Sequence, residues 1–348
     1  MLMQTPAISR AKPRHLMIWL FVVAAMIVAM VVIGGITRLT ESGLSITQWK
    51  PISGTLPPLS DADWAAEFER YKEIPEYKQL NRGMTLDGFK AIYFWEYAHR
   101  LFGRLIGLAF AVPLLWFAVR RQIPRGYAPR LIAILALGGL QGAIGWWMVA
   151  SGLSVRTDVS HVRLAVHLMT ALFLLSGIVW TALDLRSLPD ARPARLTMLS
   201  GIALGLLFAQ IMFGAFTAGL DAGYAFASWP LMGDAWFPAG VPLVEPLWRN
   251  AVDNAVVIQF VHRWLAFGVA AALGLVGWRA WQVGAPRAAI VIALLLTVQI
   301  GLGIATLLSG VWLPIAVGHQ ASAALLLITS TWTAHFLGQD VGRHAAAR

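Results

Sequence analysis

Eight mostly apolar stretches of about 20 residues or more run along this chain, and they constrain its fold more than any other feature. A helix of that length crosses a hydrocarbon core of about 30 Å. Charged residues make up 13% of the 348 residues, about half their usual share in soluble domains, which is too few for a water-soluble surface. We predict an all-α integral membrane protein with eight transmembrane helices. They are expected at residues 16–36, 89–119, 129–150, 162–183, 196–219, 252–280, 287–310 and 314–337.

The basic residues between these stretches predict the topology, because short cytoplasmic loops of membrane proteins are enriched in lysine and arginine. Most of them lie in an N-terminal arm, residues 1–15, and in the segments 120–130, 186–195, 279–287 and 338–348. The opposite loops hold single arginines or balanced charges, and they are residues 37–88, 151–161, 220–251 and 309–313. We therefore expect both termini in the cytoplasm and the second set of loops outside.

Two features of the composition exclude whole classes of function. The net charge of +10 does not indicate nucleic-acid binding, because the basic residues interrupt apolar runs and do not gather on one water-exposed face. The chain has no cysteine, which excludes disulfides, iron–sulfur clusters, covalent haem attachment and zinc fingers. A metal would have to be bound by histidine, methionine, tyrosine or carboxylate side chains.

The long loop at residues 37–88 contains the pattern of an amphipathic helix. Ser60 and Asp63 have the spacing of a capping box, and Trp64, Phe68 and Tyr71 follow at helical intervals. We expect an outer amphipathic loop helix that ends before residue 75, a proline. It could rest on lipid headgroups or act as a gate for substrate, and the sequence leaves both open.

The two halves of the chain match each other at offsets that fall from 180 to 152 residues. The matched pairs include Thr37 with Thr217, Trp49 with Trp229, His99 with His262, Gln141 with Gln299, and His167 with His319. Each half contains four spans, and an even number keeps both halves in the same orientation. We predict a parallel repeat of two four-helix bundles, residues 16–185 with the outer loop and residues 196–337. The arm 1–15, a linker 186–195 and a tail 338–348 are expected in the cytoplasm.

Four of the eight histidines belong to this repeat, and each falls in the outward half of its span. They are His99, His167, His262 and His319, whereas the histidines at 15, 161, 335 and 344 have no counterpart. A single histidine in a membrane helix could be a hydrogen-bonded interior residue. Two equivalent pairs on alternate helices favour ligation, and two histidines from facing helices suit a haem iron. Zinc would need further ligands, and none is repeated.

The residues beside these histidines differ between the halves at one position. Three residues before the histidine, on the same helical face, the first half has Glu96 and the second has Gln259. Glu96 could be a proton acceptor or could simply pair with an arginine one or two turns along the helix. Arg100 and Arg263 follow the histidines and could bind haem propionates or extend to the membrane interface. His161 could cap its helix or assist at a haem edge.

These residues stand in motifs that resemble a known family, the heme A synthases of the proteobacterial and mitochondrial-like branch. The motifs are GGITRLTESGLSITQWKPISGTLPP at 34–58, EYAHR at 96–100, HVRLAVHL at 161–168, QFVHRW at 259–264 and GHQ at 318–320. The resemblance covers residues 16 to 337, nearly the whole chain. Some members carry a cysteine pair in the outer loops, and this chain has none, so a mechanism that uses those thiols is excluded.

The resemblance implies oxidation of the C8 methyl group of heme O to the formyl group of heme A, for use in cytochrome oxidase. By this resemblance, His262 and His319 would ligate a resident heme b, and His99 and His167 would ligate or position the substrate haem. Glu96 would be the catalytic carboxylate. The location implied is the cell inner membrane. Heme O synthase would supply the substrate, an unidentified partner would exchange electrons, and a homo-oligomer is left open.

Two other interpretations fit parts of the sequence. A diheme b-type cytochrome that relays electrons from quinol would need the same four histidines but not Glu96. A transporter built on the parallel repeat could use the histidines and Glu96 as a proton relay, and it would hold no haem. A visible spectrum would separate the transporter from the other two, and conversion of added heme O would separate the enzyme from the relay.

Overall fold

The computed structural model describes residues 11–187 and 194–346, with side chains up to residue 339. Parts of the predicted arm, linker and tail therefore lie outside the described residues. The eight predicted spans are confirmed as helices long and apolar enough to cross a membrane. They are α1 (Pro13–Leu39), α4 (Leu86–Val119), α5 (Ala128–Ala150), α6 (His161–Arg186), α7 (Met198–Gly219), α9 (Ala255–Gln282), α10 (Pro286–Leu308) and α11 (Leu313–Ala346).

Local sequence explains where several of these helices begin. The side chains of Thr85, Ser160 and Thr197 each accept a hydrogen bond from a backbone amide in the first turn of α4, α6 and α7. Asn254 does the same for α9. In α1, α5 and α10 a proline occupies the first turn, where its missing amide hydrogen is not needed. These starts leave few unpaired backbone groups at the ends of the apolar spans.

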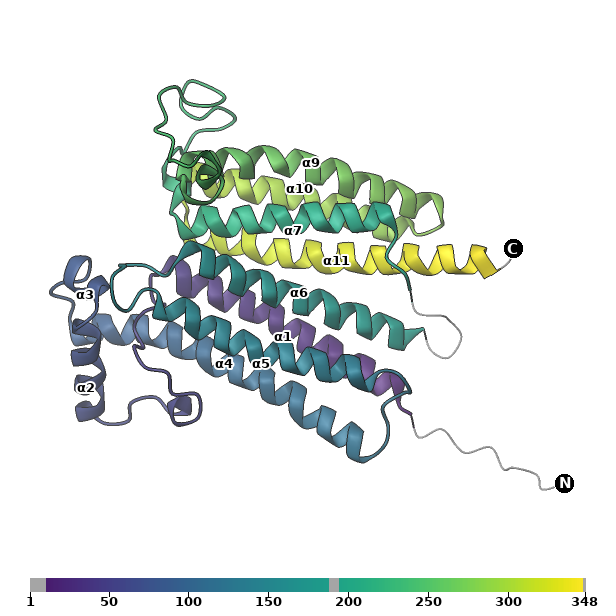
Figure 1. Ribbon diagram of the computed structural model, residues 1–348, viewed down its shortest axis with the longest axis horizontal. Helices are drawn as coiled ribbons and strands as arrows, with labels where there is room; N and C mark the ends of the chain where they lie inside the picture. The colour runs from purple at the N-terminus through teal and green to yellow at the C-terminus, as the bar shows by residue number, and fades with distance from the viewer. Residues whose placement is uncertain (1–10, 188–193, 347–348) are drawn as a thin grey trace.

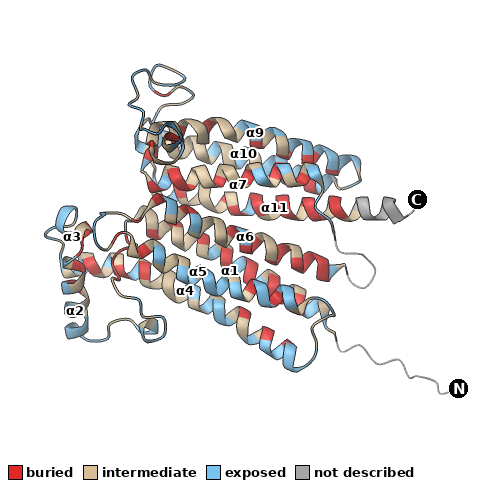
Figure 2. Ribbon diagram, in the orientation of Figure 1, coloured by how far each residue is buried: buried red, intermediate tan, exposed pale blue. Residues whose placement is uncertain are grey.

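The long helices form two groups of four (Figure 1). The helices α1, α4, α5 and α6 contact one another, and so do α7, α9, α10 and α11. The groups meet where α1 and α6 face α7 and α11. More residues are buried in these four helices than in the outer four (Figure 2). The predicted boundaries of the two bundles and the parallel axis between them stay predictions.

Charged ties join the two groups at both ends of the interface. At one end Arg38 of α1 donates to Asp221, with 3.0 Å between nitrogen and oxygen. At the other end Asp184 of α6 accepts from Arg130 at 2.6 Å and pairs with His335 of α11 at 2.9 Å. Leucine, isoleucine and valine side chains fill the space between these ties. The interface is therefore mostly apolar along its length, and the hydrogen bonds from Gln320 to the Val31 carbonyl and from Thr331 to Ser176 also cross it.

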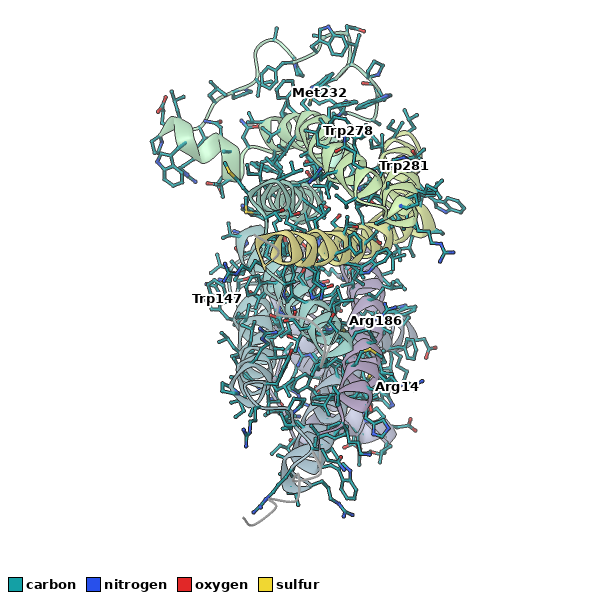
Figure 3. The ribbon with its side chains drawn as sticks, turned by 90° about the vertical axis from the view of Figure 1, so that its right-hand side faces the viewer. Arg14, Trp147, Arg186, Met232, Trp278 and Trp281 are labelled. Carbon is teal, nitrogen blue, oxygen red and sulfur yellow. The ribbon has the colours of Figure 1, made fainter. Side chains whose placement is uncertain are left out.

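Both described ends of the chain lie at the same end of the molecule (Figure 1). Figure 3 looks along the helices from that end and labels Arg14 of α1 and Arg186 of α6. The helix ends that carry the other predicted cytoplasmic arginines, after α4 and α9, lie there too (Figure 1). The separation of basic loops from the long outer loops is therefore present in the structure.

The outer loop of the first half folds against α4. It contains η1 (Ser53–Thr55), α2 (Asp61–Lys72) and α3 (Pro75–Gln79). Ser60 and Asp63 form a reciprocal capping box at the start of α2. Phe68 of α2 stacks on Phe89 of α4, with ring centroids 5.0 Å apart. The aromatic face of α2 thus packs on protein. The two roles expected for the segment, resting on headgroups and gating a substrate, stay predictions.

The outer loop of the second half is irregular. It contains η2 (Ala222–Tyr224), η3 (Leu247–Arg249) and α8 (Asn250–Asp253). Asn250 holds this loop by donating to the carbonyls of Val244 and Leu247 at 2.8 and 2.9 Å. Both outer loops lie at the end of the molecule opposite the termini (Figure 1).

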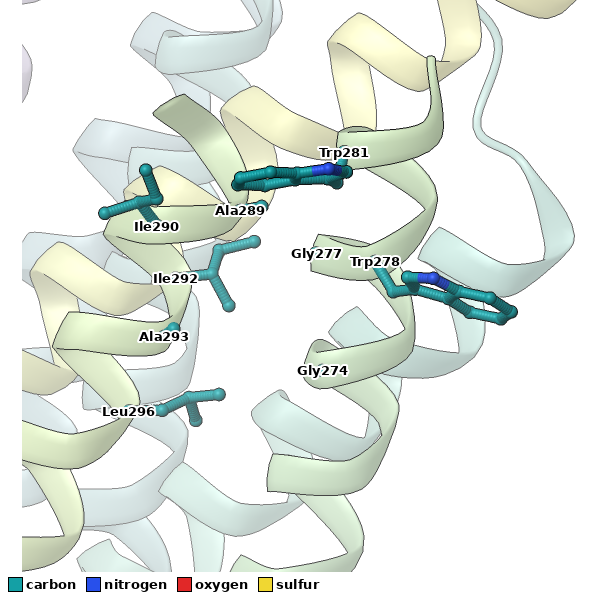
Figure 4. Close-up of a pocket in the computed structure, with 9 residues that line it drawn as sticks. All are labelled: Gly274, Gly277, Trp278, Trp281, Ala289, Ile290, Ile292, Ala293 and Leu296. Atoms are coloured by element: carbon teal, nitrogen blue, oxygen red, sulfur yellow. The ribbon is translucent and has the colours of Figure 1, made fainter. Parts of the chain in front are cut away.

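Two apolar grooves lie between neighbouring helices. One, of about 310 Å³, separates α9 from α10 (Figure 4), and the other, of about 290 Å³, separates α5 from α6. The first is lined by Gly274, Gly277, Trp278, Trp281, Ala289, Ile290, Ile292, Ala293 and Leu296. Neither groove is lined by a histidine or by Glu96. The chemically distinctive residues lie elsewhere.

Candidate functional site

The structure brings the four repeated histidines together as two pairs. The ring centroids of His99 and His167 are 6.5 Å apart, and those of His262 and His319 are also 6.5 Å apart. A metal ion bound at about 2.0–2.1 Å to one nitrogen of each ring would place the two centroids about 6.4 Å apart. Both pairs therefore fit an iron held between two imidazoles, as in bis-histidine haem ligation.

Every one of these rings faces a glycine on a neighbouring helix. A Cβ at that glycine would lie between 2.9 and 3.3 Å from a ring atom, closer than ordinary van der Waals contact. The pairs are Gly34 with His99, Gly145 with His167, Gly214 with His262, and Gly303 with His319. Small residues at helix interfaces let backbones approach closely. Here the absent side chain leaves the room that the imidazole occupies.

Glutamine residues fix the position of three of the histidines. Gln141 donates its amide to the His167 carbonyl at 2.7 Å, and Gln210 donates to the His262 carbonyl at 2.9 Å. The carbonyl of Gln299 lies 3.1 Å from Nδ1 of His319. A partner on one ring nitrogen orients the other toward a metal. The sequence repeat pointed to Gln141 and Gln299, but Gln210 has no glutamine counterpart and was missed.

Glu96 lies one helical turn from His99 and is 3% exposed. One of its oxygens accepts from the Ser45 hydroxyl and the Ile46 amide, both at 2.7 Å. The other accepts from Arg100 at 3.0 and 2.5 Å. The pairing with arginine that the sequence left open is therefore present, and Glu96 is a fully hydrogen-bonded carboxylate. Sequence patterns did not indicate that the outer loop supplies two of its donors.

Gln259 occupies the matching place in the second half and is 2% exposed. Its amide donates to the carbonyl of Phe226 at 3.0 Å, and its own oxygen has no partner within the described residues. Phe226 stands 180 residues after Ile46, the offset of the repeat, so the two loops meet their helices at equivalent points. The first loop donates to a carboxylate and the second accepts from an amide.

Arg100 and Arg263 both hold outer loops. Arg100 donates to the carbonyls of Ile46 and Gln48 at 2.7 and 3.0 Å. Arg263 donates to the carbonyls of Phe226 and Ser228 at 2.8 and 2.9 Å. The acceptors in the two halves differ by 180 residues in each case. Within the described side chains Nε of Arg263 has no partner. A role of either arginine toward propionates stays a prediction.

The remaining histidines lie away from the two pairs. His161 is the first residue of α6, behind the cap Ser160, and its Nε2 lies 3.3 Å from Asp253 of the second half. Its Cα and Cβ pack on Gly219 of α7. His335 lies at the opposite end of the interface, beside Asp184. His161 is therefore a buried contact between the groups, and the cap is Ser160 instead. The assisting role at a haem edge stays a prediction. Among the described residues no cluster of three histidine or carboxylate ligands occurs.

Known proteins match this chain over most of its length. Residues 17–331 match the family described as cytochrome oxidase assembly protein. The chain is 57% identical to the heme A synthase of Rhizorhabdus wittichii over 335 residues, covering 95% of this chain and 96% of that protein. It is 52% identical to the heme A synthase of Sphingopyxis alaskensis, with 96% of both chains covered. It is 50% identical to that of Rhodospirillum centenum, covering 95% and 91%.

Proposed function

This chain belongs to the heme A synthase family of cytochrome oxidase assembly proteins, and on that premise we propose how its two halves divide the work. Heme A synthase oxidises heme O to heme A. We assign the oxidation of the C8 methyl group to the first half, with His99 and His167 on the substrate haem. We assign a resident heme b to the second half, with His262 and His319 as ligands. The diheme relay, which would not oxidise haem, gains no support from the relatives.

The difference between Glu96 and Gln259 carries this assignment. Both side chains are buried one helical turn from a histidine of a pair, but only Glu96 can take up and return a proton. The two halves otherwise hold their histidines at equal spacing. A half that only holds a haem needs no such group, whereas a half that changes bonds at a methyl carbon does.

Glu96 has a definite task if two hydroxylations at one carbon precede the formyl group. Loss of water from the resulting diol requires that one hydroxyl lose a proton and that the other gain one. A carboxylate beside the carbon can accept the first and return the second. The Ser45 hydroxyl, the Ile46 amide and Arg100 hold Glu96 in place for this exchange.

Heme b, when bound, supplies one-electron transfer, and the second half provides what such a group needs. The rings of His262 and His319 have the required spacing, and glycines leave room for both. Gln210, whose amide nitrogen lies 3.1 Å from Nδ1 of His262, and the carbonyl of Gln299 beside Nδ1 of His319 orient them. We also propose that Arg100 and Arg263 bind haem propionates beside the loops that they hold. Each arginine directly follows a proposed iron-ligating histidine in the sequence, and a guanidinium group suits a carboxylate.

The test is conversion of heme O by the purified protein with a redox partner, followed by separation of the extracted haems. The wild type should produce hydroxylated and formyl haem. Glu96→Gln should keep its haem content and lose at least about 100-fold in rate, because it cannot take up a proton. Glu73→Gln, on an exposed side chain directly after α2, is the matched control. An active Glu96→Gln enzyme would contradict the assignment.

We propose the cell inner membrane as the location, with both termini in the cytoplasm. The arginines gathered at the shared end of the termini support this orientation. In the membrane, heme O would arrive from heme O synthase and heme A would leave for cytochrome oxidase assembly. Because the chain has no cysteine, a single Gln282→Cys substitution permits a clean test. An impermeant thiol reagent should label it only from the cytoplasmic side, and labelling from outside would reverse the topology.

A further inference from the structure

A second buried carboxylate lies in the outer segment, outside the transmembrane helices. Glu76 belongs to α3 and is 3% exposed. Its Oε1 lies 3.4 Å from the amide nitrogen of Asn81, and its Oε2 is buried with no partner within the described residues. Its position in the first turn of α3 favours a negative charge but does not provide a partner for Oε2. A buried acid with an unpartnered oxygen is costly to keep, which makes a role beyond packing the natural explanation.

Glu76 and Glu96 have neighbours that belong to one buried cluster. Asn81 also donates to the hydroxyl of Tyr71 at 2.7 Å, and Tyr71 is completely buried. Tyr71 and Ile46 belong to one buried cluster at the outer end of α4. The backbone amide of Ile46 is a donor to Glu96. The same cluster thus contacts both carboxylates, Glu76 through Tyr71 and Asn81, and Glu96 through Ile46.

Charge sets the two carboxylates apart. Glu96 is ion-paired with Arg100, whereas no basic side chain pairs with Glu76 within the described residues. Burial, followed by repulsion from Glu96 and Asp158, raises the pKa of Glu76 to about 8. Glu41 adds a smaller repulsion. Glu76 is therefore a protonated carboxyl group at neutral pH, whereas Glu96 at the haem site is paired with Arg100.

We propose that Glu76 exchanges protons with Glu96 and connects that carboxylate to the outer aqueous face. The inference rests on the proposed function of Glu96. When Glu96 takes up a proton, its negative charge disappears and Glu76 feels less repulsion. Glu76 then releases its own proton toward Asp158, whose side chain is 38% exposed, and the vacated Glu76 carboxylate takes up the proton from Glu96. Only O–H bonds form and break, and the same steps in reverse return a proton to Glu96.

The second half supplies an internal comparison for this inference. Its outer connection is 17 residues shorter between the tryptophan and the histidine of the repeat, and it has no segment that corresponds to α2 and α3. Gln259 stands where Glu96 stands, and the acidic side chains of the described second loop are exposed or half-exposed. Both carboxylates of the pair are therefore found in one half only, the half assigned to the oxidation.

Infrared difference spectroscopy of the purified full chain tests the pair without any turnover. The wild type should show a protonated carboxyl band that disappears as the pH is raised through about 8. Glu76→Gln should abolish this band, and Glu73→Gln should retain it. In Glu96→Gln the band should titrate at lower pH, because the nearest repulsive charge has been removed. A band that Glu76→Gln leaves unchanged, or that Glu96→Gln fails to move, would overturn the proposal.

Turnover provides the second readout. Glu76→Gln should keep normal haem content and slow heme O oxidation about tenfold. It should also remove the change in rate near pH 8 from the pH–rate profile. Glu76→Asp should restore part of the rate. An unaltered rate and pH profile would also overturn the proposal. If Glu76→Gln does not fold, the Glu96→Gln infrared titration still decides, since the outer segment is then intact. If the wild type oxidises no heme O but the Glu76 band still titrates at lower pH in Glu96→Gln, the proposed function fails and the proton link between the two carboxylates stands.

Discussion

The two halves of this protein hold their histidines in the same way and differ in what lies beside them. In both halves the ring centroids are 6.5 Å apart, and an arginine ties the outer loop to the helix of the first histidine. In the first half the outer loop places the Ser45 hydroxyl on Glu96. At the matching positions the second half has Ala225 and Gln259, so the acid and one of its donors are both missing.

This difference teaches that the histidine frame, meaning the groups that position the histidines, is separable from the acid–base chemistry beside it. The frame depends on glycines and loop carbonyls, which the halves share. The chemistry depends on a carboxylate and on donors that stabilise its charge, which only the first half provides. Evolution of a duplicated unit can alter the second feature without disturbing the first, and substitutions should be able to do the same.

The largest effect should come from removing a ligand of one pair. His262→Ala or His319→Ala should abolish tightly bound heme b, because one imidazole alone leaves the iron without its second axial ligand. His99→Ala should leave heme b in place and lose heme O instead. A pyridine hemochrome assay of the purified variants measures both. Loss of heme b from His99→Ala, with retention in His262→Ala, would reverse the assignment of the halves.

An intermediate effect is expected from making the second half resemble the first. In Gln259→Glu an acidic oxygen would face the Phe226 carbonyl, where the amide now donates at 3.0 Å. Two acceptors in contact should destabilise the protein by about 1–3 kcal/mol, measured by thermal unfolding. Adding Gln259→Glu to Glu96→Gln should not restore oxidation. Exposed Gln282→Glu serves as the control, and equal stability of the two variants would contradict the argument.

The smallest effect should come from the glycines. A Cβ at residue 303 would lie 2.9 Å from the His319 ring, so Gly303→Ala should weaken heme b binding by about 1–3 kcal/mol. Haem transfer to an acceptor protein measures that loss, and a shifted low-spin resonance would report the displaced ring. Gly301→Ala is the matched control, since a Cβ there meets nothing within 4 Å. Identical behaviour of both variants would show that the glycine does not position the ring.

Periodicity and repetition in the sequence predicted most of the large-scale features of the structure. The eight spans and the helix that begins after Ser60 follow from patterns within a few turns, and the importance of the four histidines follows from the match between the two halves. An apolar stretch of this length has no other stable form in a bilayer, because every backbone group must be bonded within its own segment. Such local rules need no tertiary information.

The contacts across helices could not be predicted in this way. No pattern indicated that the Ile46 amide would reach Glu96, or that Gln210 would hold His262. His161 looked like a helix cap, but it lies between the two groups beside Asp253. No sequence pattern singled out Glu76, and its burial became visible only once α2 and α3 were packed on α4. These contacts join residues far apart in the chain, where spacing carries no information.

The sequence by itself therefore determined that the chain folds in a membrane, the number of spans, the duplicated histidines and the difference between Glu96 and Gln259. Each of these depends on residue type, on spacing along one helix or on the match between the two halves of the sequence. Only the tertiary structure decided which glycine faces which ring, which loop atoms stabilise Glu96, and that Glu76 is buried beside the same cluster. The physical reason is that burial and hydrogen bonding between distant segments depend on how helices pack, and packing is a property of the assembled bundles.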